Sequence, residues 1–389
     1  MGIVLTFNAG SSSLKFSGFK RTEGDPSRLF KGHFDAGKAP DSLTIELSTG
    51  EDFALGLEQS GDLSSAFETL LRWSSQHQSA GNIDAIGHRI VHGGLTYTNP
   101  IVLDDASLSE LAKLEPLAPL HQPFNLKGVR LARRAFPGVP QIGCFDTAFH
   151  RRHPFVNDTF GLPYRFFDEG VRRYGFHGLS YTSISEALGR RDPKFAKAKV
   201  IVAHLGSGAS MCAIREGQSI GSTMGFSALD GLPMGTRCGQ LDPGVLIYLM
   251  ETHGLDRAEL TDLLYRESGL LGISGISNDM RVLLESDRPR AQDAIDYFVF
   301  RIRREIGAMT AVLGGLDALV FTGGIGENSA VVRERICADF GWLGLSIDPS
   351  KNDQHADVVS PDGSQVEVMV LPTDEEAVIA HAAIDLAEG

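Results

Sequence analysis

Apolar and polar positions alternate in blocks along the chain, and two of these blocks share an unusual form. An apolar run at Ile3–Phe7 ends in Asn8, and a second apolar run at Leu14–Phe19 follows a short stretch of glycine and serine. This pattern predicts a β-hairpin with a polar tip. The same order recurs at residues 200–214, V-I-V-A-H-L-G-S-G-A-S-M-C-A-I, so strands are expected on either side of G-S-G. The repeat predicts a duplicated domain.

Polar tips of this kind suit the binding of phosphate. Backbone N–H groups, serine hydroxyls and Lys15 would point toward a common place, as a polyphosphate with a metal ion requires. An ordinary Gly/Ser turn is the alternative for either tip taken alone. Two copies favour phosphate binding and predict a two-lobed clamp with a nucleotide held between the lobes.

Further apolar runs predict strands and helices in an α/β order. Strands are expected at residues 28–34, 43–47, 53–57, 83–91, 139–145 and 317–321, and helices at 63–77, 290–313 and 374–386, the last capped by Thr373. Residues 107–136 are helical at both ends, but three prolines interrupt them, so L-A-P-L-H-Q-P-F-N is expected to be a loop. Residues 32–39 approach a phosphate-binding P-loop motif, yet Ala39 and Pro40 do not fit it, which predicts an ordinary loop.

Length and charge narrow the functional classes. A chain of 389 residues is too long for one hydrophobic core, so two domains are expected. The formal net charge of −13 argues against nucleic acid and against an anionic membrane as partners. No apolar segment approaches the roughly 18 residues of a membrane span, so the expected location is the cytoplasm. The four cysteines form no C-x-x-C pair and are expected to be reduced thiols.

Two arginines and several histidines are candidates for chemistry. Arg89 and Arg237 lie in glycine-rich, apolar contexts where a guanidinium needs a carboxylate or a phosphate; a structural ion pair is the alternative for each. His121, His177 and His204 match no zinc spacing and are interpreted as hydrogen-bond donors near phosphate, with His177 the strongest candidate. His150 and His153 are expected at the surface.

Two further positions follow buried strands. Asp146 lies at the carboxyl end of an expected strand, the edge where ligands gather in α/β sheets. G-G-I-G-E-N, residues 323–328, lies between a strand and a helix, where glycines let the backbone approach a flat ring or a phosphate closely. A tight strand–helix turn is the alternative. Beside two phosphate hairpins, this segment is interpreted as the contact to the purine.

Ten motifs, taken in order, closely resemble those of the acetate kinase family. They are N-A-G-S-S-S-L-K, G-H-R-I-V-H-G-G, L-A-P-L-H-Q-P, F-D-T-A-F-H, Y-G-F-H-G, A-H-L-G-S-G, G-L-P-M-G-T-R-C-G, N-D-M-R, T-G-G-I-G-E-N and T-D-E-E. The resemblance covers nearly the whole chain. It implies the actin/sugar-kinase fold, with two duplicated ribonuclease-H-like domains, mixed sheets, an interdomain cleft for the nucleotide, and a homodimer. The first domain is placed at residues 1–148 with 373–389, and the second at 149–372.

The resemblance also implies roles for individual residues. Mg²⁺, with Mn²⁺ as an alternative, would lie near Asn8 and Glu375. The phosphates of ATP or ADP would contact Ser11, Ser13, Lys15, His204, Leu205, Gly206, Ser207 and Gly208. The nucleoside would be held by Asp279, Met280, Arg281, Gly324, Ile325, Gly326, Glu327 and Asn328. The substrate carboxylate would bind Arg89, with its methyl group in a pocket of Val91, Leu120, Phe176 and Ala228.

Asp146, His177 and Arg237 are the implied catalytic residues, and one of these roles needs adjustment. A carboxylate nucleophile is already ionised at pH 7, because carboxyl pKa values lie near ~4, so it needs no general base. Asp146 is therefore better interpreted as orienting Arg89, Arg237 or the metal. His177 and Arg237 would stabilise charge on the moving phosphoryl group.

Departures from the family pattern leave the substrate and the nucleotide contacts open. Ser207, Tyr181, Gln240, Asp374 and Gln122 stand where the family usually has Asn, His, Asp, Asn and Asn. The expected reaction is reversible phosphoryl transfer from ATP to acetate. A kinase for propionate or another short-chain carboxylate is the alternative, and an actin-like ATPase switch is a further one that leaves the arginine pair unexplained.

Overall fold

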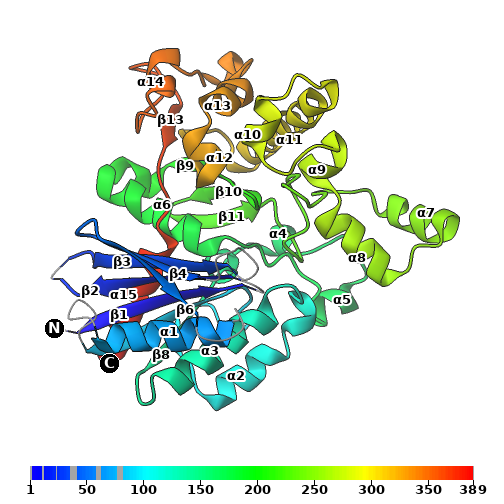
Figure 1. The fold of residues 1–389 in the computed structure, drawn as a ribbon. Helices are drawn as coiled ribbons and strands as arrows, with labels where there is room; N and C mark the ends of the chain where they lie inside the picture. The colour runs from blue at the N-terminus through cyan, green and yellow to red at the C-terminus, as the bar shows by residue number, and fades with distance from the viewer. Residues whose placement is uncertain are drawn as a thin grey trace. The chain divides into compact units, whose positions relative to one another are not determined.

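The computed structural model describes residues 2–10, 13–22, 24–35, 42–57, 63–76 and 82–388. The chain forms two compact units, Met1–Arg151 with Asp374–Gly389 and Arg152–Thr373. Each unit contains one mixed β-sheet, and the C-terminal helix, drawn in red in Figure 1, belongs to the first unit.

The first unit is built on a sheet of eight strands in the order β5-β4-β3-β2-β1-β6-β8-β7. Strand β1 pairs antiparallel with β2 and parallel with β6, which in turn pairs parallel with β8. The strands are β1 Ile3–Ala9, β2 Ser13–Lys20, β3 Ser27–Asp35, β4 Ser42–Leu47, β5 Asp52–Gly56, β6 Ile83–Ile90, β7 Ile101–Val102 and β8 Gln141–Phe145.

Helices cover both faces of this sheet. Side chains of α1 (Leu63–Gln76) and α3 (Gln122–Ala135), among them Phe67, Trp73 and Ala132, share one core with alternate residues of β1 to β4. Helix α15 (Glu375–Glu388) packs on β6, β1 and β8. A Cβ atom on Gly87 of β6 would overlap Ile379 of this helix, so only glycine allows that close approach. Helix α2 (Asp105–Ala112) packs against α3.

The second unit repeats the plan with five strands. Its order is β11-β10-β9-β12-β13, with β9 to β11 antiparallel and β9, β12 and β13 parallel. The strands are β9 Lys199–Leu205, β10 Ala209–Arg215, β11 Gln218–Ser222, β12 Ala318–Thr322 and β13 Glu367–Val370. Counted in chain order, β3-β2-β1-β6-β8 and β11-β10-β9-β12-β13 are the same arrangement. The predicted α/β fold with duplicated, mixed sheets is confirmed.

Long and short helices complete the second unit. The amphipathic stripe predicted near residues 290–313 forms α11 (Pro289–Leu313), which ends at Gly314 in the left-handed conformation. The others are α4 Phe155–Asp158, α5 Tyr164–Asp168, α6 Gly178–Arg191, α7 Pro243–His253, α8 Arg257–Arg266, α9 Gly269–Ser274, α10 Met280–Leu284, α12 Gly323–Asn328, α13 Ala330–Cys337 and α14 Pro349–Asp353.

Several local expectations were wrong. The expected loop at L-A-P-L-H-Q-P-F-N is only partly a loop, because α3 begins inside it and Pro123 occupies the first helical turn, where proline is tolerated. The N-terminus of α15 is capped by Asp374, whose Oδ1 accepts from the backbone N–H of Ala377, instead of by Thr373. Residues 32–35 of the near match to a P-loop lie in β3 instead of in a loop, and residues 36–39 are outside the described part of the chain. His150, expected at the surface, is fully buried.

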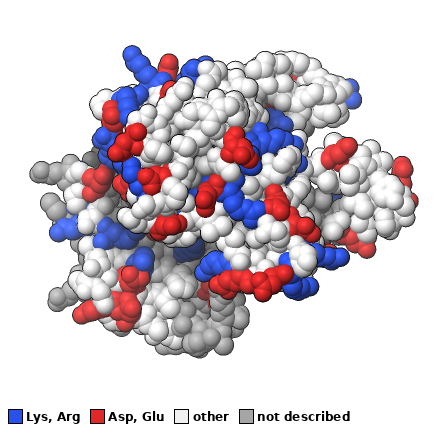
Figure 2. All heavy atoms as spheres, turned by 90° about the horizontal axis from the view of Figure 1, so that it is seen from above, with Lys and Arg blue, Asp and Glu red and all other residues white. Residues whose placement is uncertain are grey.

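The surface carries charges of both signs. On the face seen in Figure 2, Lys and Arg lie among Asp and Glu over the described part of the chain. The free cysteines are Cys144, Cys212 and Cys337, which are buried, and Cys238, which is partly buried. Within the described ranges no helix is long and apolar enough to cross a bilayer.

Candidate active site

In the first unit, Arg89 is the centre of a cluster of oxygen-bearing side chains. Its Nε and Nη2 donate to Oδ2 of Asp146 at 3.0 and 2.6 Å, and its Nη1 donates to Oδ1 of Asn8 at 3.3 Å. Oε2 of Glu375 lies 3.9 Å from Nε. These residues come from β6, from the end of β8, from β1 and from the start of α15. The cluster therefore forms where the carboxyl ends of parallel strands meet a helix N-terminus.

Burial and charge make this ion pair strong. The Asp146 side chain is 1% exposed and that of Arg89 is 24% exposed, so water screens the pair weakly. Burial alone would lower the pKa of Arg89, but attraction to Asp146 and Glu375 outweighs it and raises the pKa above its ordinary value. Arg89 is thus a fixed cation. Contacts with the described residues use three of its five N–H donors, which leaves two for an anionic ligand.

A buried amide fixes the strands that carry Asn8 and Arg89. Asn125 of α3 accepts a hydrogen bond from the backbone N–H of Val91 through Oδ1 at 2.9 Å, and donates from Nδ2 to the carbonyl of Ala9 at 2.7 Å. It therefore bridges the ends of β1 and β6. Gln122, a departure from the family pattern, also points inward and bonds both backbone groups of His92. Sequence reasoning missed Asn125 and did not predict this role of Gln122, although both lie in the H-Q-P-F-N segment.

The first hairpin forms as predicted, with β1 and β2 antiparallel. Asn8 pairs with Lys15 across β1 and β2, so both side chains lie on the same face of the sheet. Ser13 begins β2, and its backbone carbonyl accepts from the N–H of Gly10. Ser11, an expected phosphate contact, lies outside the described residues.

In the second unit, the β9–β10 hairpin carries an arrangement of histidines. The tip, Gly206 to Gly208, follows His204, which is opposite Ser210 in the strand register. The rings of His177 and His204 stack with centroids 4.4 Å apart. His177 precedes α6 in the left-handed backbone conformation, with φ of 57°. Such a backbone is uncommon for a residue with a side chain and is found at functional sites.

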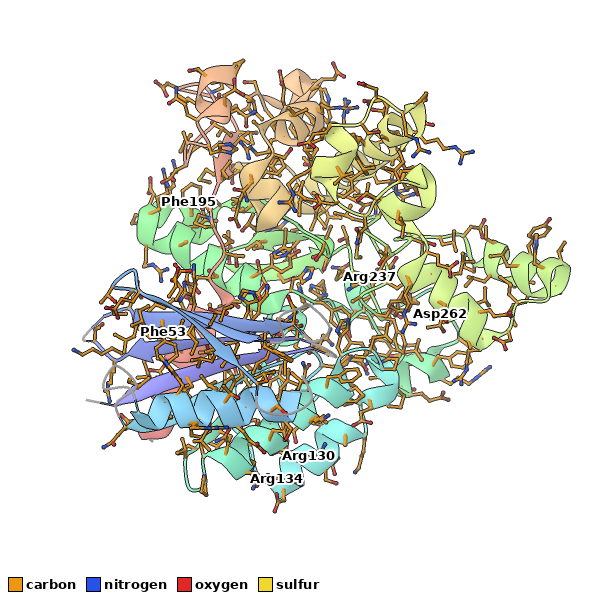
Figure 3. The ribbon with its side chains drawn as sticks, viewed as in Figure 1. Phe53, Arg130, Arg134, Phe195, Arg237 and Asp262 are labelled. Carbon is orange, nitrogen blue, oxygen red and sulfur yellow. The ribbon has the colours of Figure 1, made fainter. Side chains whose placement is uncertain are left out.

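Gly208 marks the place where two predicted catalytic residues converge. A Cβ atom on Gly208 would lie 3.4 Å from Nε2 of His177 and 4.0 Å from Nη1 of Arg237. Arg237 is in the long segment between β11 and α7 (Figure 3), and its Nη1 also donates to the carbonyl of Ala228 at 3.1 Å. A side chain at position 208 would therefore occupy space that these two donors border.

A pocket of about 680 Å³ in the same unit contains most of the residues predicted to hold a nucleoside. Its lining comes from three places, the hairpin tip, the start of α10 and the turn at α12. The predicted residues that line it are Gly206, Ser207, Asp279, Met280, Arg281, Gly324, Ile325 and Asn328, and sequence reasoning missed Asn278, Leu284, Glu285 and Ser329. Arg281 is itself paired with Asp279, at 2.6 Å.

The turn at α12 is supported from beneath. Glu327, predicted to hold the nucleoside, is not among the residues that line the pocket, and its Oε1 accepts from the backbone N–H groups of Gly323 and Thr373. The fully buried Arg333 donates to the carbonyls of Gly326 and Glu327 at 2.9 and 2.8 Å, and to Asn352. No motif marks Arg333 in the sequence, because its partners are backbone carbonyls of a distant turn.

The four residues expected around a substrate methyl group divide between the units. Val91 and Leu120 belong to the first unit, and Phe176 and Ala228 belong to the second. Val91 and Phe176 are buried. Among the described residues, no three His, Cys, Asp or Glu side chains gather as a metal cluster.

Comparison with known proteins decides the family. The model of the acetokinase family matches residues 3–381. The chain belongs to the acetokinase family. It is 50% identical to an acetate kinase of Methylocella silvestris, with 98% of this chain and 97% of the relative covered, and 48% identical to one of Nitrobacter hamburgensis, with 99% and 96% covered.

Solved structures of acetokinase relatives have the same fold. A propionate kinase from Francisella tularensis matches with a TM-score of 0.93 at 35% identity, covering 99% of this chain and all of that one. An acetate kinase from Porphyromonas gingivalis matches with a TM-score of 0.89 at 37% identity, with the same coverage. The expected family and fold are confirmed, and the chain is a kinase acting on a carboxylate.

Proposed function

We propose that this acetokinase catalyses reversible transfer of the terminal phosphoryl group of ATP to acetate, which gives acetyl phosphate and ADP. The observation that carries the proposal is the Arg89 cation, held by Asp146 and Asn8, with two N–H donors that no described residue is seen to use. A planar guanidinium with unused N–H groups is suited to a carboxylate. Membership of a family whose relatives are named acetate kinase supports the same substrate.

Acetate would bind as an anion through Arg89. Its carboxylate is ionised at neutral pH and is already a nucleophile, so Asp146 has no proton to remove. The 1% exposure of the Asp146 side chain and its two contacts to Arg89 support an orienting role instead. Asp146 would hold the guanidinium group of Arg89 in one orientation, so that acetate always binds in the same orientation.

The phosphoryl group would be stabilised by donors from both hairpins. Lys15 and Ser13 would contact the phosphates from the first hairpin, with the undescribed Ser11, and residues 204–208 from the second. His177 and Arg237 would donate to the oxygens that gain charge as the group moves, which lowers the barrier by charge neutralisation and alignment. Their convergence at Gly208 supports a shared target.

The first cluster contains oxygen atoms of the kinds that a divalent cation binds. Asn8 and Glu375 contribute an amide and a carboxylate oxygen, the donor types that Mg²⁺ accepts, and Mn²⁺ is an alternative. We propose that these two residues would hold the ion and that phosphate oxygens and water would complete its shell. When bound, the ion would neutralise charge on the phosphates.

The nucleoside would occupy the pocket of about 680 Å³ beside α10 and α12. Gly324 would lie against the flat base, next to Ile325, because a glycine backbone has no side chain and allows close approach. Asp279 and Arg281 would border the opposite side. The volume falls within the range of roughly 300–1,000 Å³ that is typical of small-molecule sites.

The experiment that tests the proposal measures ADP formation from Mg-ATP with and without acetate. An acetate kinase forms ADP only when acetate is present. Formation of ADP at the same slow rate in the absence of acetate would contradict the proposal and favour an actin-like ATPase switch. Arg89→Ala is the matched control, since it should abolish the dependence on acetate at low acetate concentrations.

Propionate is the second candidate substrate, and two observations favour it. One structural relative is named a propionate kinase. The family resemblance also implies proline where this chain has Ala228, and a smaller side chain would enlarge the acyl pocket. One methylene in an apolar site changes the free energy by roughly 1–3 kcal/mol. We expect appreciable propionate turnover with acetate preferred. Phe124, in the H-Q-P-F-N segment where the family resemblance implies a smaller residue, would prevent propionate turnover if its ring fills the added space.

The variant Ala228→Pro tests the acyl pocket. It keeps the carbonyl group that accepts from Arg237 while adding volume. We expect the ratio of kcat/KM for acetate to that for propionate to rise by at least several-fold. An unchanged ratio would show that Ala228 does not contact the acyl group, and absent propionate turnover in the unsubstituted protein would show that Phe124 closes the pocket.

A homodimer is the proposed assembly, and the surface of α7 supports it. No residue of this helix is buried, and Ile247, Tyr248 and Met250 are 58, 56 and 52% exposed. Contiguous apolar side chains on a helix surface mark protein interfaces. A second copy of the chain, docked through α7, would cover them.

A further inference from the structure

A line of hydrogen bonds leads away from His177 into the core of the second unit. Nδ1 of His177 lies 2.8 Å from Oγ of Ser210, and Oγ of Ser210 lies 2.5 Å from the hydroxyl of Tyr181. Ser210 and Tyr181 are both fully buried. Oγ of Ser180, the residue before Tyr181, lies 2.8 Å from Nδ1 of His204. Consecutive residues of α6 thus support the two stacked histidines.

We propose that Tyr181 is a positioning residue that acts through Ser210 to hold His177 neutral, with its proton on Nε2. Tyr181 stands where the family usually has histidine, so this chain makes the contact with a phenol. The proposal rests on the proposed function, because the tautomer of His177 affects catalysis only if His177 contacts the moving phosphoryl group.

The direction of the hydrogen bonds follows from the chemistry of the three groups. A phenol is a stronger acid than a serine hydroxyl, so Tyr181 is the better donor to the shared oxygen. Ser210 then has its own O–H left to donate to Nδ1 of His177. A neutral imidazole whose Nδ1 accepts a hydrogen bond must carry its proton on Nε2.

The surroundings of His177 favour the same state. Nε2 faces the hairpin tip at Gly208, where Nη1 of Arg237 also lies. Charged or titratable neighbours among the described residues include His204 on β9, Arg237 and Tyr181. A second positive charge beside Arg237 would be repelled, so the neutral ring is preferred. The left-handed backbone of His177 fixes the position of its Cβ atom. The hydrogen bonds from Tyr181 through Ser210, called the relay below, fix the rotation and the tautomer of the ring.

The tautomer can be measured without any activity assay. In protein labelled with ¹⁵N-histidine, long-range ¹H–¹⁵N spectra distinguish the two neutral tautomers and the imidazolium, and His177→Gln assigns the signal. We expect His177 to show a protonated Nε2 and an unprotonated Nδ1 at pH 7.5. A protonated Nδ1, or two protonated nitrogens, would overturn the proposal even if acetate kinase activity is present.

Kinetics then test the role of the phenol. Tyr181→Phe removes only the hydroxyl, and we expect kcat to fall about 3- to 10-fold, as for loss of one buried hydrogen bond, with KM for acetate and ATP within twofold of the parent. Ser210→Ala should lower kcat further, and Tyr181→Phe should add nothing in that background. Tyr181→His should restore kcat to within about twofold, because an imidazole can also donate to Ser210.

Tyr174→Phe is the matched control, since it removes another buried tyrosine hydroxyl, one bonded to the carbonyl of Gly170 at 2.7 Å. We expect it to leave kcat unchanged. Equal losses in Tyr174→Phe and Tyr181→Phe, additive losses in the double variant, or an unchanged kcat in Tyr181→Phe would each contradict the relay. If Tyr181→Phe does not fold, Ser210→Ala and the spectrum of the parent protein still decide.

Discussion

At the scale of single residues, Arg89, Arg237 and His177 should have separable roles. Arg89 is proposed to contact the ground-state carboxylate, so Arg89→Ala should raise KM for acetate by at least 10-fold. Arg237 and His177 are proposed to act on developing charge, so their alanine variants should mainly lower kcat, by about 10²- to 10³-fold as for a lost transition-state donor. Steady-state kinetics on purified variants would check this, and equal small effects at all three positions would contradict the assignment.

Gln240 offers a stability test at the same scale. Its Oε1 accepts from Nη2 of Arg301 at 2.7 Å and also from Arg304, so two guanidiniums face a neutral amide. Gln240→Asp would supply the charge that the family usually has there. We expect a gain of about 0.5–1 kcal/mol, because the site is exposed. Thermal unfolding in low and high salt measures it, and a gain that persists unchanged at 1 M salt would exclude an ionic origin.

The sequence predicted some residue contacts and missed others for a clear reason. An arginine in an apolar context needs an anion, which is why the partner of Arg89 could be expected, and Asp146 fills that role. Asn125 and Arg333 instead bond backbone groups of distant segments. Such partners depend on the tertiary fold and have no fixed spacing along the chain.

At the scale of elements, Asn125 of α3 should affect the site because its side chain joins the ends of β1 and β6. Asn125→Ala would leave the N–H of Val91 and the carbonyl of Ala9 without their partner in a buried place. An unsatisfied buried group costs about 1–3 kcal/mol. We expect lower thermal stability together with a raised KM for acetate. Asn125→Asp, which keeps one acceptor, should be intermediate; normal kinetics in Asn125→Ala would refute the bridging role.

Helices and strands were predicted well where the apolar periodicity is strong, and poorly where the residues at a helix N-terminus determine its first residue. The stripe of α11 and the buried strands were predicted to within a few residues. The predicted start of α3 and the predicted cap of α15 were wrong. A proline can either interrupt a helix or occupy its first turn, and either Thr373 or Asp374 could have capped α15. The salt bridge from Arg28 to Asp374, at 2.7 Å, belongs to the fold and has no local signature.

At the scale of the whole molecule, two buried histidines should make stability depend on pH. Burial lowers the pKa of His88 to about 4 and that of His92 to about 3, so both are neutral in the folded chain. In the unfolded chain they take up protons below about pH 6.5, so the unfolded state gains protons and stability falls as the pH drops from 6.5 toward 4. At pH 5, each histidine lowers the free energy of unfolding by up to about 2 kcal/mol relative to its value above pH 6.5.

Thermal unfolding between pH 7.5 and pH 5 checks this dependence. We expect Tm to fall by several degrees, and His88→Gln, which can still donate to Gln141, should make the fall smaller. The buffers should share one ionic strength. An identical slope in His88→Gln would show that carboxylates alone produce the effect.

The assembly can be tested through the exposed face of α7. We expect light scattering to give about twice the chain mass of 42.0 kDa for the unsubstituted protein. Ile247→Glu with Tyr248→Glu should yield monomers, since two charges would be buried in the interface. Val102→Glu, at a half-exposed apolar position of the first unit, is the control and should remain dimeric. Dimers of the double variant would exclude α7 as the interface.

The most direct test of the whole account is to trap the product. Incubation with Mg-ATP, acetate and hydroxylamine converts acetyl phosphate to acetohydroxamate, which is measured by its coloured iron complex. The account predicts hydroxamate that requires both ATP and acetate, accumulates in step with ADP and falls sharply in Arg237→Ala. Release of inorganic phosphate from ATP without hydroxamate, at a rate that acetate does not change, would contradict it.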